Sequence, residues 1–155
     1  MQHDHEEPGT VTLTRTYNHS ASAVFAAWSD QDAVTAWSDP GDGWHLVFDR
    51  FDFQVGQIDL CRFGPAGGPE YINENHYLAI DPDRRIVFST SLNVGGRLTF
   101  AGVVTVHFSE CEAGCEMRLV EDGLYFDPED GAAAHLEGWN HMLDELGRYL
   151  DSGKR

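Results

Sequence analysis

Three polar side chains, Arg62, Glu74 and His76, are the first candidates for chemistry in this sequence. They lie in segments 57–63 and 70–80, where apolar residues alternate with a period of two, which predicts strands. If the apolar faces point inward, Arg62 and Glu74 can neutralise each other, and His76 can donate, accept or titrate near neutral pH. Two alternatives stay open: a structural ion pair at a strand end, or a register shifted by one residue that leaves all three in water.

The same alternation in later segments adds apolar candidates for the lining of a pocket. Phe88 and Val106 fall on apolar faces of two further predicted strands, and Trp139 and Leu143 lie on the apolar stripe of a predicted helix. The predicted ligand-binding residues are Arg62, Glu74, His76, Phe88, Val106, Trp139 and Leu143.

The sequence has no motif for covalent, nucleotide or metal chemistry. It contains no Gly-x-Ser-x-Gly elbow, and Gly95-Gly96 is not followed by the lysine of a phosphate-binding loop. His135 and His141 are six residues apart on one predicted helix, so they cannot chelate one ion together. We therefore expect no metal and no cofactor, name no catalytic residue, and leave proton transfer in an apolar pocket open.

Composition narrows the class of protein and of partner. The chain has 155 residues, 41% of them hydrophobic, and a net charge of −16. Such an acidic chain repels nucleic acid and anionic lipid, so we expect neither nucleic acid nor membrane as a partner. Three cysteines, no run of about 18 apolar residues and an acidic start without a signal-peptide pattern predict a cytoplasmic protein.

The hydrophobic pattern predicts one domain. Residues 1–9 are expected to be a flexible N-terminal tail, and residues 10–155 a single domain. The predicted order is a strand, two short helices, six strands and a long helix, with ranges 10–18, 21–28, 32–37, 44–53, 57–63, 70–80, 84–92, 98–109, 116–122 and 129–151.

The last helix is the element that must position any pocket. Apolar residues recur in it at steps of three and four, from Leu136 through Trp139 to Leu150. A helix of this length can lie across a whole sheet and cover its apolar face. We predict an α+β fold in which a curved antiparallel sheet of about seven strands wraps on this helix and leaves a cavity between them.

Four segments resemble one family in the order in which they occur. They are TRTYNHSASAVFAAWSDQDAVTAWSDP at 14–40, IDPDRRIVFS at 80–89, VTVHFSE at 104–110 and GWNHMLDELGRYL at 138–150. They resemble the heat-shock-protein-90 ATPase activator homologue family of the START-like, SRPBCC, helix-grip superfamily. The resemblance implies a helix-grip fold with a hydrophobic pocket, and it brings no shared catalytic motif.

Three functions follow as hypotheses. The first is binding of a small apolar molecule between the sheet and the C-terminal helix. The second, implied by the resemblance alone, is a co-chaperone-like module that binds and stimulates a heat-shock-protein-90 type ATPase. The third is an enzyme, a cyclase, hydrolase or dehydratase, on a bulky apolar substrate. We expect binding rather than catalysis, in a monomer or a homodimer.

Overall fold

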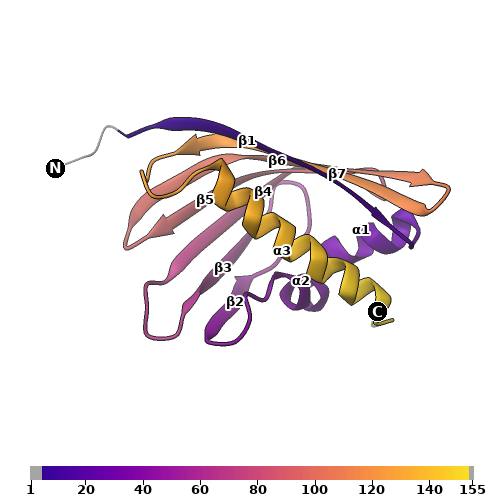
Figure 1. Cartoon of the computed structure of the whole chain (residues 1–155), viewed down its shortest axis with the longest axis horizontal. Helices are drawn as coiled ribbons and strands as arrows, with labels where there is room; N and C mark the ends of the chain where they lie inside the picture. Colours follow the sequence, from indigo (N-terminus) through magenta and orange to yellow (C-terminus); the bar gives the residue numbers. More distant parts are fainter. Residues whose placement is uncertain (1–4, 154–155) are drawn as a thin grey trace.

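The computed structural model describes residues 5–153. Seven strands and three helices follow one another along the chain (Figure 1). They are β1 (Glu7–Tyr17), α1 (Ala21–Ser29), α2 (Gln31–Ser38), β2 (Trp44–Arg50), β3 (Ile58–Pro65), β4 (Tyr71–Asp81), β5 (Arg85–Val94), β6 (Arg97–Cys111), β7 (Gly114–Tyr125) and α3 (Ala132–Asp151).

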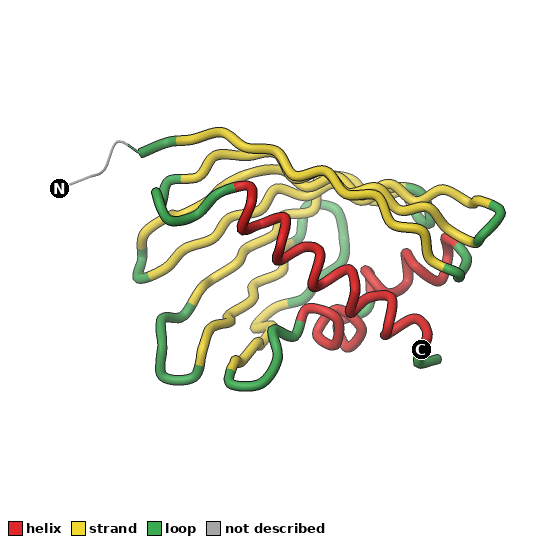
Figure 2. The backbone as a smooth tube through the Cα atoms, in the orientation of Figure 1, coloured by secondary structure: helices red, strands yellow, loops and turns green. Residues whose placement is uncertain are grey.

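All seven strands form one antiparallel sheet in the order β1-β7-β6-β5-β4-β3-β2. Strands β2 to β7 pair in the order of the sequence, and β1 pairs with β7. The two edges of the open sheet are therefore β1 and β2. The sheet bends strongly, and α3 runs across its concave side (Figure 2). The predicted α+β fold with a long C-terminal helix is confirmed. No helix within residues 5–153 is long and apolar enough to cross a membrane.

A row of three glycines crosses the inner face of the sheet. Gly123 of β7 pairs with Gly9 on one side and with Gly102 on the other. The rings of Phe100 and Tyr125 fold over this row, so a Cβ on Gly123 would lie 2.8 Å from the Phe100 ring. Glycine is needed at these positions because the two aromatic rings lie directly on the backbone and leave no space for a side chain.

The helix α1 begins at the predicted residue, and α2 begins one residue before the predicted start. The Ser20 side chain accepts a hydrogen bond from the Ala23 amide at 3.1 Å, and Asp30 accepts one from the Ala33 amide at 3.0 Å. These caps satisfy amides that the first helical turn leaves without partners. The helix α3 has no side-chain cap at its start, so other contacts must fix that end.

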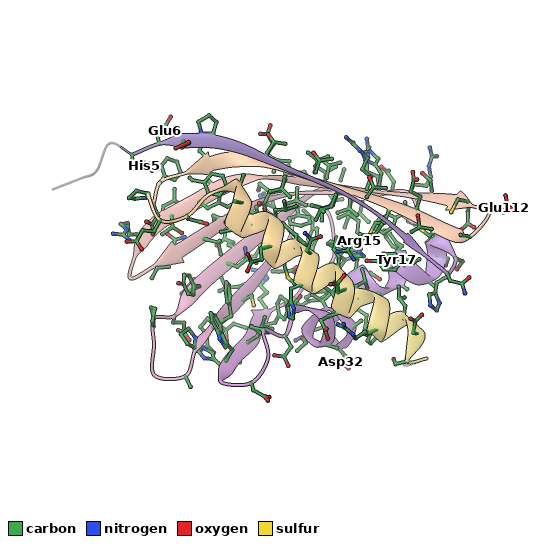
Figure 3. All side chains as sticks on the ribbon, viewed as in Figure 1. His5, Glu6, Arg15, Tyr17, Asp32 and Glu112 are labelled. Atoms are coloured by element: carbon green, nitrogen blue, oxygen red, sulfur yellow. The ribbon has the colours of Figure 1, made fainter. Side chains whose placement is uncertain are left out.

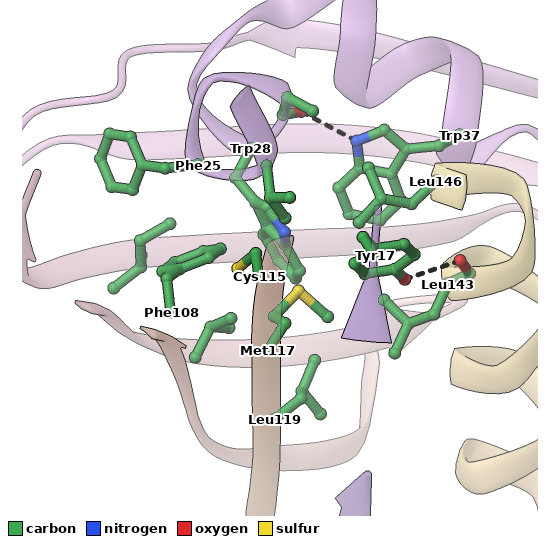
Figure 4. Close-up of a cluster of buried hydrophobic side chains, with 14 of the residues drawn as sticks. Tyr17, Phe25, Trp28, Trp37, Phe108, Cys115, Met117, Leu119, Leu143 and Leu146 are labelled. Atoms are coloured by element: carbon green, nitrogen blue, oxygen red, sulfur yellow. Dashed lines mark hydrogen bonds between the residues drawn. The ribbon is translucent and has the colours of Figure 1, made fainter. Parts of the chain in front are cut away.

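The second half of α3 packs into a closed core. Leu143, Leu146 and Leu150 are almost completely buried in one cluster with residues of α1, α2, β1, β6 and β7. Figure 4 shows Leu143 and Leu146 in this cluster. The Tyr17 hydroxyl donates to the Leu143 carbonyl at 2.8 Å, and Arg15 forms an ion pair with Asp144 at 2.6 Å. Both side chains come from β1, beside α3 in Figure 3. Edge strand and helix are thus joined directly.

Two sequence-based assignments are wrong in detail. The strand β1 begins at Glu7, inside the tail predicted for residues 1–9, of which residues 1–4 lie outside the described part. The inward face of β3 and β4 is the opposite of the predicted one. Irregular pairing between Tyr77 and Ala79 shifts the alternation, so that Ile80 packs on the core while Leu78, two residues earlier, is 48% exposed.

Replacing a glycine of the row should destabilise the protein. In Gly123→Ala the new methyl group would also lie 2.4 Å from the Ala101 carbonyl oxygen, so backbone and ring must both move. We expect the free energy of unfolding to fall by about 1–3 kcal/mol, measured by urea denaturation.

The matched control is Gly138→Ala in α3, where an added Cβ meets no atom within 4 Å. Helix propensity should raise its free energy of unfolding by about 0.5–1 kcal/mol. Equal stability of Gly123→Ala and the wild type would contradict the tight packing inferred for the row.

Candidate ligand cavity

A cavity of about 390 Å³ lies between the first half of α3, the helix α2 and the strands β2 to β5. Its rim includes Trp44, 43% exposed, and the exposed helix residues Gly138 and His141. Aromatic side chains are the most numerous kind in its wall. The aromatic lining residues other than tyrosine and histidine are Trp28, Trp37, Trp44, Phe48, Phe51, Phe53, Phe63, Phe88, Phe100 and Trp139.

All four tryptophans of the chain line this cavity. Trp28 stacks on Trp139 with ring centroids 6.2 Å apart, and its contact with Trp37 is closer, at 4.8 Å. Trp37 donates its indole N–H to the Ala27 carbonyl at 2.9 Å, a bond drawn in Figure 4. The indole nitrogen of Trp28 is buried without a hydrogen-bond partner in the described part of the chain. These large rings make the inner wall rigid and apolar.

A buried carboxyl group, Asp59, is the first polar feature of the cavity. It is 3% exposed, accepts a hydrogen bond from the Tyr77 hydroxyl, and accepts another from the Asp52 amide at 3.1 Å. Burial raises the pKa of the Asp59 carboxyl, and the hydrogen bond from Tyr77 opposes that rise. Burial also raises the pKa of the Tyr77 phenol. The pair places a titratable acid inside an aromatic wall.

A second polar strip consists of amides and a hydroxyl on β4 and β5. The Asn73 amide donates to the Thr90 hydroxyl at 3.0 Å and to the Asn75 side-chain oxygen at 3.2 Å. All three residues line the cavity. Asn73 and Asn75 make the inner face of β4 polar. A prediction that places the more apolar face of a strand inward therefore chose the wrong face of β4.

The third polar feature ties β7 to the first turns of α3. Glu121, 4% exposed, accepts a hydrogen bond from the Trp139 indole at 3.1 Å and lies 2.6 Å from the His135 ring. The other nitrogen of that ring lies 2.9 Å from Asp130. Burial alone would lower the pKa of His135, but its bonds to Asp130 and Glu121 outweigh this and raise it to about 9. His135 is therefore a cation at neutral pH.

The structure separates the predicted site residues into three groups. Phe88 and Trp139 line the cavity, whereas Val106 and Leu143 are fully buried in the closed core. The remaining three, Arg62, Glu74 and His76, lie on strand positions that alternate with the cavity-lining ones, so their predicted inward orientation is wrong.

The predicted ion pair between Arg62 and Glu74 is also absent. Arg62 binds Asp49 at 2.6 Å and Glu70 at 3.3 Å instead, both partly exposed on the outer side. On the outer side water solvates the side chains of Arg62 and Glu74. These two residues therefore do not need the buried ion pair that an inward orientation would have required.

Three functional candidates were missed by sequence reasoning, namely Asp59, Glu121 and His135. Glu121 carried a usable signal, because it continues the alternation of Met117 and Leu119 on the inner face of β7. His135 precedes Trp139 by four residues, one helical turn. Asp59 had no such signal, since neither face of β3 is uniformly apolar.

No group of three or more histidine, cysteine, aspartate or glutamate side chains within residues 5–153 is arranged to hold a metal ion. The one cysteine on the cavity wall, Cys61, is buried, which raises the pKa of its thiol to about 12. It is therefore protonated at neutral pH and a poor nucleophile. The polar groups of the cavity can donate and accept hydrogen bonds and carry charge.

The model of one protein family, described as Activator of Hsp90 ATPase homolog 1-like protein, matches residues 18–151. The chain belongs to this family. The resemblance seen in the four sequence segments is thus confirmed, and the bent sheet closed on α3 is the START-like, helix-grip fold of these activator-homolog proteins. No curated protein matches the chain significantly.

Solved structures of similar proteins agree with the fold of this activator-homolog protein. The Mll3558 protein from Rhizobium loti is 34% identical, with a TM-score of 0.84 over 93% of this chain and 98% of its own. A protein from Rhizobium leguminosarum is 25% identical, with a TM-score of 0.86 over 95% and 97%. An AHSA1-like protein from Aeromonas hydrophila shares the fold at 19% identity, with a TM-score of 0.69 over 92% of each chain.

The ion pairs of His135 should make stability depend on pH. Because its pKa rises from 6.5 in the unfolded chain to about 9 when folded, its stabilisation is complete below pH 6.5 and is lost as the pH rises through 9. At roughly 1.4 kcal/mol per pH unit this contribution is about 3 kcal/mol. We expect the free energy of unfolding to decline across this window, and His135→Gln to flatten the decline.

The control for this titration is His107→Gln, which removes an exposed histidine of β6. The wild type, His135→Gln and His107→Gln can be compared by urea denaturation between pH 6 and pH 10. The free energy of unfolding of His107→Gln should decline as in the wild type. A decline of the same size in His135→Gln would exclude His135 as its source.

Proposed function

We propose that this activator-homolog protein binds a small hydrophobic molecule in the cavity between α3 and the sheet. The observation that carries the proposal is an aromatic-lined space of about 390 Å³ that reaches the surface beside Trp44 and Gly138. Ligand sites are typically concave, mostly apolar and supplied with a few convergent polar groups. The space has all three properties.

The aromatic walls would supply most of the binding free energy. Apolar surface that leaves water contributes roughly 25 cal/mol per Å², and the rings are held in place by one another before a ligand arrives. The polar groups Asp59, Asn75 and Thr90 would orient the ligand between these walls.

Fewer observations support the other two hypotheses, a co-chaperone role and an enzymatic activity. The co-chaperone role is supported by the family description alone, and an enzyme would require a substrate whose reacting atoms reach Asp59 or Glu121. Ligand binding needs only the cavity itself. The cytoplasmic location and the monomeric or dimeric state stay predictions.

A side chain placed at position 138 should block the cavity without harming the fold. Gly138 lies at the rim, and an added Cβ there meets open space. We expect the wild type to bind the neutral fluorophore N-phenylnaphthylamine with a dissociation constant on the order of micromolar. Gly138→Leu should weaken this binding at least about tenfold, since a leucine side chain fills part of the volume the ring needs.

The matched control is Glu137→Leu, which adds the same side chain at an exposed neighbouring position outside the cavity lining. It should bind the fluorophore like the wild type. Binding can be followed through probe emission and through quenching of the four cavity tryptophans. Wild-type affinity in Gly138→Leu, with its thermal stability retained, would refute the cavity as the binding site.

A further inference from the structure

The charges that face the cavity are almost all of one sign. Asp59 and Glu121 contribute carboxyl groups, and no arginine or lysine within residues 5–153 lines the wall. The one buried cation, His135, has a carboxylate on each ring nitrogen, so it offers no free N–H to a ligand. With a net charge of −16 on the whole chain, the field in this cavity favours cations over anions.

Of the two carboxyl groups, Asp59 is the one with no ion-pair partner among residues 5–153, whereas Glu121 is already paired with His135. Glu121 already faces two N–H groups that are fixed in α3, on His135 and Trp139. Asp59 accepts one hydrogen bond on each oxygen, from Tyr77 and from the Asp52 amide, and a carboxylate can accept about four. It can therefore take a further donor without losing either neighbour.

The surroundings of Asp59 also suit a positive charge. The Tyr77 ring contacts Phe53 at 4.9 Å and Phe88 at 5.9 Å between centroids, and all three rings line the cavity beside the carboxyl group. Ring faces attract cations, most strongly where water is excluded. Carboxylate and rings together form a site that a neutral ligand would leave partly unused.

Resting on the proposed function, we infer that the ligand is an apolar organic amine, bound as its ammonium ion with the charge at Asp59 and the carbon skeleton among the aromatic rings. Folding has already removed Asp59 from water, so only the ammonium group loses its hydration when the complex forms. An anionic ligand of the same shape would meet two acidic groups and, within residues 5–153, no arginine or lysine on the wall.

Three probes with one skeleton test this inference: phenylbutylamine, phenylbutanol and phenylbutyrate, which are cationic, neutral and anionic at neutral pH. Titration of the wild type by calorimetry should show the amine binding on the order of tenfold more tightly than the alcohol, and the acid most weakly. Asp59→Asn should abolish the preference for the amine while leaving alcohol binding within about twofold. Asparagine can keep the bond from the Asp52 amide with its side-chain oxygen while its NH2 group donates to the Tyr77 hydroxyl oxygen, so the fold should survive.

The matched control is Glu74→Gln, which removes one negative charge from the outer side of β4. Glu74→Gln should still bind the amine more tightly than the alcohol. If this variant lost the preference, the preference would come from the net charge of the protein, and the assignment of Asp59 as the counter-ion would be overturned. Equal affinity for the amine and the alcohol would overturn the amine inference but leave cavity binding intact, whereas no binding of any probe would refute the proposed function as well.

A measurement on the wild type keeps the inference testable if Asp59→Asn does not fold. The carboxyl carbon resonance of Asp59 should shift when phenylbutylamine binds beside it, and should shift much less with phenylbutanol. No movement with saturating amine would exclude Asp59 as the counter-ion.

Discussion

The carboxylate of Glu121 determines how far the beginning of α3 stands from the sheet. It receives the Trp139 indole and faces the His135 ring, so two successive turns of the helix are joined to one residue of β7. The first turn has no side-chain cap, and these bonds hold it in place instead. Because each partner is buried, breaking one would leave a charge or donor without compensation, which makes the arrangement hard to deform.

The helix thereby serves two purposes along its length. Its second half buries leucines against a closed core and is joined to β1 by Tyr17 and Arg15. Its first half is held at a fixed height above β3 to β5, and the space below it is not filled. A helix packed tightly at both ends of the sheet would have removed this cavity. The helix-grip fold creates the cavity, and the side chains that line it in this chain determine which ligands fit.

The sequence predicted the fold well because long, regular patterns carry it. The apolar stripe of α3 and the alternation of β5, β6 and β7 depend on many residues each, so a single exception did not mislead the prediction. The cavity was harder to predict. Its wall on β4 is made of Asn73, Asn75 and Tyr77, while apolar Ile72 faces out, and the irregularity after Tyr77 shifts the alternation.

The polar groups of the cavity were missed for a related reason. Asp59 and His135 depend on partners distant in sequence, Tyr77 and Glu121, and a pattern within one segment contains no information about such pairs. Only the pairing of β3 with β4 and the docking of α3 bring these side chains together.

The glycine row has a consequence for how this architecture can diversify. Beneath His135 the layers are backbone, then the rings of Phe100 and Tyr125, then the imidazole, with ring centroids 4.5 Å and 4.9 Å from it. Because bare backbone is the lowest layer, the rings of Phe100 and Tyr125 set the distance between the sheet and the His135 ring. Substitutions on the opposite wall, among the side chains of β2 to β4, would change the shape and polarity of the cavity without touching these layers.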